Sequence, residues 1–186
     1  MTPYPFLMKQ GRLEVVCGPM FAGKSTRLLA RCAELAAAGL AVQAFKPARD
    51  DRYDGARHIV THDGRRLEAR PVVDAAEVLA ADAPAVLVDE VHFFGDAIVE
   101  PCLRLVRSGR VVIVAGVDRD HRGRPFAPFP ALLCEADRVD KLHATCARCG
   151  EAACHSQRLV DSDAHIVVGG PEAYEPRCRS CFRPAP

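Results

Sequence analysis

Short apolar runs alternate with segments of helical spacing along most of the chain. The runs have strand length and end at polar residues, Pro or Gly, which is typical of buried strands. They cover residues 13–17, 41–45, 84–88 and 111–115, and residues 139–143, which are more polar, are expected to form the last strand. Between them, apolar residues recur three or four positions apart, which predicts helices over residues 25–38, 74–81, 98–106 and 130–136. Fully apolar strands that alternate with helices predict an α/β fold whose parallel sheet is covered on both faces.

Individual residues mark the ends of these predicted elements. Gly39 stands where the first helix would stop, and Gly116 is expected to close the fourth strand. Asp74, with Glu77 three residues later, has the pattern of a capping box. Pro101 marks the expected start of the regular part of the third helix.

Two segments do not follow the alternation. Residues 1–10 are interpreted as a loose leader, too short and too rich in Pro for a signal peptide. Residues 48–70 are polar and rich in Arg, and they contain the pair Asp63-Gly64. This pair is typical of a hairpin turn, although a plain surface loop accounts for the segment equally well.

The stretch Gly18-Pro-Met-Phe-Ala-Gly-Lys-Ser25 lies between the first predicted strand and the first predicted helix, and it has the complete P-loop pattern. Its glycines allow successive N–H groups to point inward around an anion, and the helix N-terminus adds partial positive charge. We expect Lys24 to reach the β- and γ-phosphates of a nucleotide, and Ser25 to ligate Mg²⁺. The predicted phosphate-binding residues are Gly18, Pro19, Met20, Phe21, Ala22, Gly23, Lys24 and Ser25.

Two acids, Asp89 and Glu90, follow the third predicted strand, which is where P-loop proteins keep the acid on the Mg²⁺ side. Asp89 would hold the ion, and Glu90 would be free to act as a base toward the group that attacks the γ-phosphate. A water nucleophile would make the protein an ATPase, and a substrate hydroxyl would make it a kinase. Because Asp89-Glu-Val-His92 is also the pattern of a helicase box, this motif alone leaves both open.

The chain has 186 residues, of which 49% are hydrophobic and 26% charged, as in ordinary globular proteins. The net charge of +1 argues against nucleic acid as a partner, because such proteins are usually strongly basic. No apolar run is long enough to span a bilayer, so we expect no membrane association. An odd count of nine Cys beside a nucleotide site favours a reducing, cytoplasmic location.

Four cysteines form two Cys-x-x-Cys pairs, and five are scattered. The pairs are Cys146 with Cys149 and Cys178 with Cys181. Four thiolates on two tight turns suit a closed structural Zn²⁺ site, and redox-active pairs are the competing interpretation. The five others are expected to be buried small hydrophobes; they are Cys17, Cys32, Cys102, Cys134 and Cys154.

The character of the chain changes at Thr145, where Cys, Gly and small polar residues take over. We therefore predict a P-loop domain over residues 1–144 and a small zinc-binding domain over residues 145–186. Zinc would fix the base of the long loop between the two pairs, and such a loop is often a lid.

Taken together, these stretches resemble the thymidine kinase family of the zinc-containing P-loop type, found in bacteria and in animal cytosol. The resemblance covers about residues 11–182. Besides the P-loop and the Cys pairs it rests on Lys46-Pro47, Asp50-x-Arg52-Tyr53, Thr61-His-Asp-Gly64, Asp89-Glu-Val-His-Phe-Phe94, Gly116-Val-Asp118, Arg124-Pro-Phe126, Lys141-Leu142, Gln157-Arg-Leu159 and Gly169-Gly170 with Tyr174.

The resemblance implies a RecA-like P-loop domain with a small zinc ribbon that carries a lid loop. It also implies transfer of the ATP γ-phosphate to the 5′-hydroxyl of thymidine, with Glu90 as general base and Asp89 and His92 on the nucleotide side. The thymine base would be held largely by main-chain groups of residues 165–170. The implied substrate-binding residues are Met20, Asp50, Arg52, Phe93, Val117, His121, Phe126, Ser156, Val168, Gly169 and Tyr174. A homotetramer and feedback binding of dTTP are implied as well.

Two residues depart from the family pattern. His121 stands where the family usually has a phenylalanine facing the base, and His92 replaces a common glutamine. An imidazole can still stack on a base, but it makes the pocket sensitive to pH. An exposed loop histidine is the alternative interpretation of His121.

Two other classes of protein compete with a nucleoside kinase. A P-loop ATPase or helicase fragment would use the same Asp-Glu-Val-His box, but the chain lacks a second motor-like domain and a basic surface. A zinc-ribbon binding module with a vestigial nucleotide site is the other. ADP release that depends on a nucleoside distinguishes the kinase from both.

Overall fold

The computed structural model describes residues 10–49, 57–61 and 63–184. Two of the predicted substrate-binding residues, Asp50 and Arg52, lie outside this range. So does the predicted leader, apart from Gln10.

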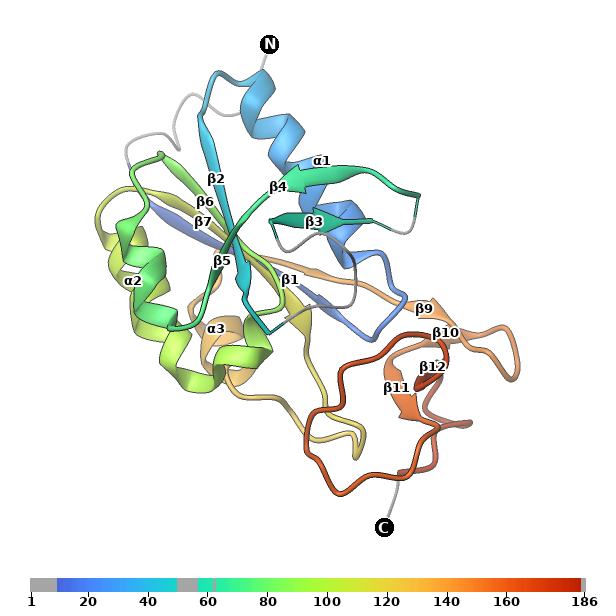
Figure 1. Ribbon diagram of the computed structural model, residues 1–186. Coiled ribbons are helices and arrows are strands. Elements are labelled where there is room, and N and C mark those ends of the chain that lie inside the picture. Colours follow the sequence, from blue (N-terminus) through green and yellow to red (C-terminus); the bar gives the residue numbers. More distant parts are fainter. Residues whose placement is uncertain (1–9, 50–56, 62, 185–186) are drawn as a thin grey trace.

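The core of the described chain is one parallel sheet of six strands in the spatial order β5-β2-β6-β7-β1-β8 (Figure 1). Every neighbouring pair in it is parallel. In chain order the strands are β1 (Arg12–Gly18), β2 (Val42–Pro47), β5 (Arg70–Val72), β6 (Ala85–Val88), β7 (Val111–Val117) and β8 (Arg138–Lys141). All five predicted strands are present, and the predicted α/β class is confirmed.

Two apolar layers cover the sheet, as the fully apolar strands predict. Along β1, Val15 packs into one layer and Val16 into the other, because successive side chains point to opposite faces. One face carries α1 (Lys24–Ala37) and the antiparallel hairpin of β3 (His58–Val60) and β4 (Arg66–Glu68). The other carries η1 (Ala75–Ala80), η2 (Val91–Ile98), α2 (Val99–Arg107) and α3 (Phe129–Glu135).

Three of the predicted boundary signals act as expected. Gly39 has φ 81° and follows the last turn of α1. Asp74 caps η1 in a capping box with Glu77. The Asp63-Gly64 pair lies in the hairpin turn, where the Gly64 N–H donates to the Thr61 carbonyl at 2.9 Å. The hairpin, which the sequence left undecided, is therefore present.

Other predictions at element ends are wrong by a few residues. Helix α2 begins at Val99, two residues before Pro101. The helix tolerates a proline in its first turn because the N–H that proline lacks would have no partner there within the helix. Strand β7 runs through Gly116 to Val117 instead of ending there. A Cβ at Gly116 would lie 3.1 Å from His92 Nδ1, so this glycine leaves room for η2 against the strand.

The scattered cysteines are less uniformly buried than predicted. Cys17 and Cys102 are fully buried, whereas Cys32 and Cys154 are half-buried and Cys134 is exposed. The prediction is wrong for Cys134 because α3 turns Leu132 toward the sheet and leaves Cys134 on its outer side.

The C-terminal part consists of two small antiparallel ladders beside the carboxyl ends of the sheet strands (Figure 1). The first pairs β9 (Ala144–Thr145) with β10 (Ala152–Ala153), and the second pairs β11 (His155–Arg158) with β12 (Tyr174–Arg177). Residues 159–173 form the loop between β11 and β12, which we call the lid. The predicted domain boundary at 144/145 falls within β9.

Among the described residues, no helix has the length and apolar character that crossing a membrane requires.

Candidate active site

The P-loop follows β1 at the carboxyl end of the sheet. Gly18 has φ 145°, and a Cβ there would lie 2.4 Å from the Leu142 carbonyl oxygen, so only glycine fits. Gly23, with φ 79°, precedes the first residue of α1, Lys24. The loop thus brings its backbone and the positive end of α1 to one place, which is the arrangement that holds phosphate groups.

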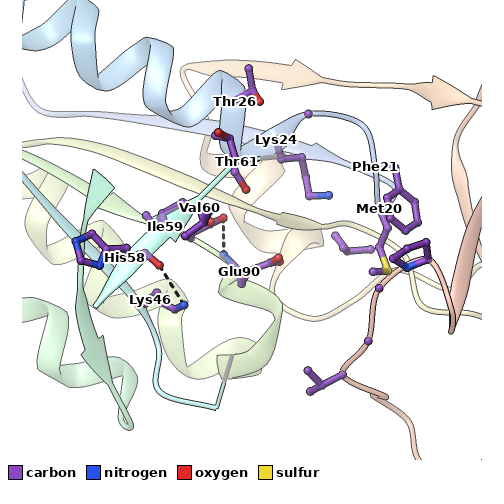
Figure 2. A pocket seen from close by; sticks show the side chains of 18 of the residues that line it. Met20, Phe21, Lys24, Thr26, Lys46, His58, Ile59, Val60, Thr61 and Glu90 are labelled. Atoms are coloured by element: carbon purple, nitrogen blue, oxygen red, sulfur yellow. Dashed lines mark hydrogen bonds between the residues drawn. The ribbon is translucent and has the colours of Figure 1, made fainter. Parts of the chain in front are cut away.

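A cavity of about 400 Å³ opens beside this loop. The Lys24 side chain is buried, and its Nζ donates to the Pro19 carbonyl at 2.8 Å. In Figure 2, Lys24 extends from α1 toward the side where Met20 and Phe21 lie. The predicted nucleotide-site residues that line this cavity are Met20, Phe21, Gly23, Lys24, Ser25 and Asp89; Gly18, Pro19 and Ala22 belong to the same loop.

The two acids lie where β6 ends, next to the P-loop. Both are buried, both line the large cavity, and the Asp89 carboxylate accepts the Glu90 backbone N–H at 2.9 Å. Glu90 has φ 50°, and among the described non-glycine residues only Phe21 shares a positive φ. Such a conformation costs about 1–3 kcal/mol and persists where surrounding structure imposes it. Both strained residues are therefore at the candidate site.

A second, smaller cavity of about 40 Å³ lies between the sheet and the lid. All nine implied substrate-binding residues within the described chain line it: Met20, Phe93, Val117, His121, Phe126, Ser156, Val168, Gly169 and Tyr174. Met20, Val117, Val168 and Gly169 also line the large cavity, so the two cavities adjoin.

His92 lies between Glu90 and the second cavity. Its Nδ1 is 3.4 Å from Glu90 Oε2 and accepts the Val117 backbone N–H at 3.4 Å. Its ring lies against Phe93 and Phe126, with centroid separations of 4.5 and 5.1 Å. The structure thus places His92 in the wall of the second cavity, where it limits the positions open to the Glu90 carboxylate.

Ser156 joins the C-terminal part to the P-loop. Its hydroxyl accepts the backbone N–H of Met20 at 3.0 Å, and the serine is almost fully buried. Strand β11 is thereby fixed against the P-loop.

His121 is buried, and its Nδ1 has no hydrogen-bond partner among the described residues. Burial lowers the pKa of its imidazole below the ordinary 6.5, the positive charge of Arg158 lowers it further, and Asp120 opposes both. The exposed-loop interpretation of this histidine is therefore wrong. A neutral ring faces the second cavity near neutral pH.

The pKa of His121 predicts a loss of stability in acid. The folded state favours the neutral imidazole, so the unfolded state binds more protons once the pH falls below 6.5. The free energy of unfolding should be highest above pH 6.5 and should decrease as the pH is lowered from there. We expect His121→Phe to lose less stability than wild type between about pH 7.5 and about pH 5.5, measured by urea unfolding. The exposed His143→Gln variant, as control, should behave as wild type, and an unchanged fall in His121→Phe would contradict the prediction.

Four cysteine sulfurs converge in the C-terminal part. The Sγ atoms of Cys146, Cys149, Cys178 and Cys181 all lie within 4.8 Å of one another. Burial opposes ionisation of Cys146, but N–H groups around it outweigh this and lower the pKa of that thiol to about 6. Because metals bind the thiolate, the cluster is suited to hold a metal ion.

Sequence reasoning did not assign several residues that line the cavities. Lys46 is buried at the end of β2, lines the large cavity and donates from Nζ to the His58 carbonyl at 3.3 Å. Thr61 lines the same cavity, and Arg158 lines the second. A charged residue directly after an apolar run was the available signal for Lys46.

These features define a class of protein: a P-loop enzyme with a phosphate site, a buried carboxylate pair and an adjoining pocket closed by a lid. The family model described as thymidine kinase matches residues 11–182, and the chain belongs to the thymidine kinase family.

Individual relatives are similar over nearly the whole chain. The thymidine kinase of Rhodothermus sp. (strain ITI 518) is 44% identical over 190 residues, covering 99% of this chain and 89% of its own length. The thymidine kinase of Roseiflexus sp. (strain RS-1) is 44% identical over 94% of this chain and 96% of its own. That of Bacteroides thetaiotaomicron is 39% identical over 94% and 88%.

Proposed function

We propose that this protein is a thymidine kinase, which transfers the γ-phosphate of ATP to the 5′-hydroxyl of thymidine and releases dTMP and ADP. The observation that carries the proposal is the pair of adjoining cavities. One is lined by the P-loop, Asp89 and Glu90, and the other by all nine described residues that the family pattern assigns to the nucleoside. An ATPase would need only the first.

The P-loop backbone and Lys24 would hold the phosphates, which is most of what phosphoryl transfer asks of a protein. Ser25 and Asp89, a hydroxyl and a carboxylate lining the same cavity, fit the hard oxygen ligands that Mg²⁺ prefers. When bound there, Mg²⁺ would neutralise charge on the β- and γ-phosphates. Asp50 and Arg52 are proposed to lie near the phosphates and the nucleophile.

Glu90 is the proposed general base. It lies on the boundary between the phosphate cavity and the His92 wall of the second cavity, where the 5′-hydroxyl of a bound nucleoside would meet the γ-phosphate. A carboxylate here can accept the hydroxyl proton as the bond to phosphorus forms.

The nucleoside would bind under the lid. The second cavity, of about 40 Å³, is much smaller than the first and adjoins it. We propose that the lid moves outward to admit the thymine base and then encloses it. Closing the lid over the substrate excludes water, which favours transfer to the sugar over hydrolysis of ATP.

The metal of the cysteine cluster is proposed to be Zn²⁺. Four thiolates in one cluster form the closed tetrahedral site typical of structural zinc, and soft sulfur ligands disfavour Mg²⁺ and Ca²⁺. The zinc would join Cys146 and Cys149 to Cys178 and Cys181, and so fix both ends of the segment that carries the lid.

Family resemblance supports two further proposals, a homotetramer and feedback inhibition by dTTP. The change in composition at Thr145 supports a third, that residues 145–186 act as a separate small domain. The composition of the chain supports a cytoplasmic location and the absence of nucleic acid among its partners.

ADP release in the presence of ATP and Mg²⁺, measured with each of several nucleosides and with none, tests the proposal. We expect ADP release to require thymidine and to be weaker with 2′-deoxyuridine, which lacks only the methyl group, because an apolar slot for one methyl favours thymine by roughly 10–200-fold. Release indifferent to nucleosides would favour the ATPase instead.

A further inference from the structure

One buried arginine organises the lid. Arg158 is the last residue of β11, and its guanidinium donates to the carbonyl oxygens of Ser162 at 3.1 Å, Ala164 at 2.8 Å and His165 at 2.9 Å. The loop is therefore wrapped around a single cation at its base. Hydrogen bonds from a charged donor are roughly twice as strong as neutral ones, so this contact contributes strongly to the lid's internal order.

Tyr174, at the other end of the lid, completes this arrangement. Its hydroxyl donates to the Val167 carbonyl at 3.0 Å and lies 3.4 Å from an Arg158 nitrogen. The guanidinium also lies 5.8 Å from the centre of the tyrosine ring. The two side chains therefore hold both ends of the lid in one cluster.

The main-chain groups of the lid fall into two sets: those that are hydrogen-bonded to Arg158 or Tyr174, and those that are not. The carbonyls of Ser162, Ala164, His165 and Val167 are engaged by these two side chains. Within the described chain, the N–H and C=O groups of Ile166, Val168 and Gly169 make no hydrogen bond. These three residues line the second cavity, together with His165 and Val167, whose carbonyls point to Arg158 and Tyr174 instead. The groups left available thus belong to the residues at the proposed nucleoside site.

We infer that Arg158 is the positioning residue that sets which main-chain groups of the lid face the nucleoside. The planar guanidinium donates several hydrogen bonds in fixed directions, so it can orient three carbonyls at once. The inference deepens the proposed function and rests on it for the identity of the ligand.

The lid's base is also fixed relative to the phosphate site. Ser156, two residues before Arg158 on the same strand, binds the Met20 N–H of the P-loop. At the lid's far side, His165 Nε2 lies 3.4 Å from Asp120 Oδ2. Arg158 therefore orders the lid from a strand that is fixed against the P-loop, which keeps the nucleoside in register with the γ-phosphate.

The test compares Arg158→Met and Arg158→Lys with the control Arg183→Met. Arg183 is exposed, and its guanidinium also donates to carbonyls, those of Ser180 and Phe182, outside the lid. We expect Arg158→Met to raise the KM for thymidine on the order of ten- to a hundredfold, because misplaced contacts around a substrate have effects of that size. The KM for ATP and the zinc content should stay at wild-type values. Arg158→Lys should recover part of the loss, and Arg183→Met should show none.

A second readout needs no nucleoside. Amide hydrogen exchange in residues 159–173 should be faster in Arg158→Met than in wild type, while exchange in the parallel sheet stays the same. Unchanged exchange in the lid, or an equal rise in both KM values with loss of zinc, would overturn the inference. If wild type fails to phosphorylate thymidine, the proposed function is wrong, and the exchange measurement still decides whether Arg158 orders the lid.

Discussion

Glu90→Gln is expected to lower kcat for thymidine phosphorylation by about 10²–10⁴-fold, the usual contribution of a general base. Glutamine keeps the size of the side chain and the contact with His92, but it cannot accept the proton of the 5′-hydroxyl. The KM for ATP should change little, because the phosphate-binding groups come from the P-loop. Steady-state kinetics with thymidine and ATP measure both quantities.

The matched control for this substitution is Glu100→Gln. Glu100 is an exposed glutamate of α2 that pairs with Arg107 at 3.0 Å, so the same chemical change there should leave kcat as in wild type. A Glu90→Gln enzyme that retains wild-type kcat would contradict the assignment of the base. Loss of ATP binding in this variant would instead indicate that the strained backbone at Glu90, with φ 50°, has been disturbed.

Loss of the metal is expected to abolish thymidine phosphorylation while ATP binding remains. Structural zinc sites contribute about 10–16 kcal/mol to the folding of small peptides. We expect the other contacts within residues 145–186 to be too weak to compensate for the loss of this free energy. Cys178 directly follows β12, which pairs with β11, the strand that carries Ser156 and Arg158. Without the metal, the lid would lose both its base and its connection to the P-loop.

We expect Cys178→Ser to lose bound zinc and thymidine-dependent activity together, measured by metal analysis and by dTMP formation. Binding of a fluorescent ATP analogue should persist, because Lys24, Asp89 and the sheet lie outside the C-terminal part. Cys134→Ser, at an exposed cysteine outside the cluster, is the control and should resemble wild type. Full zinc content in Cys178→Ser, or full activity in its metal-free form, would contradict this account.

Most of the parallel sheet could be predicted because its strands are apolar on both faces, and a short, wholly apolar run such as residues 111–115 is typical of a buried parallel strand. Strand β5 was missed because Arg70-Pro-Val72 is short, begins with an exposed arginine and has no apolar run. This strand is stabilised by parallel pairing with the edge of β2, a contact between segments that are distant in the sequence. Gly116 was misplaced for a related reason: its function is to make room for η2, a contact that no local pattern reveals.

The residues of the candidate site likewise fall into those that the sequence predicts and those that it does not. The P-loop and the acid pair are local motifs, and the sequence is sufficient to find them. The residues of the second cavity come from widely separated regions of the chain, and only a family pattern could group them in advance. Arg158 belongs to the Gln157-Arg-Leu159 motif but could be given no function from it, because its role depends on carbonyl groups four to seven residues away. Main-chain geometry of this kind leaves no trace in residue type.

Transfer of labelled phosphate from [γ-³²P]ATP tests the central claim most directly. The wild-type protein is incubated with Mg²⁺ and thymidine, and the products are separated and identified. We expect the label to appear in dTMP, at the 5′ position, in amounts equal to the ADP formed. Label released as inorganic phosphate at the same rate with and without thymidine would contradict it, and would identify the two adjoining cavities as parts of an ATPase.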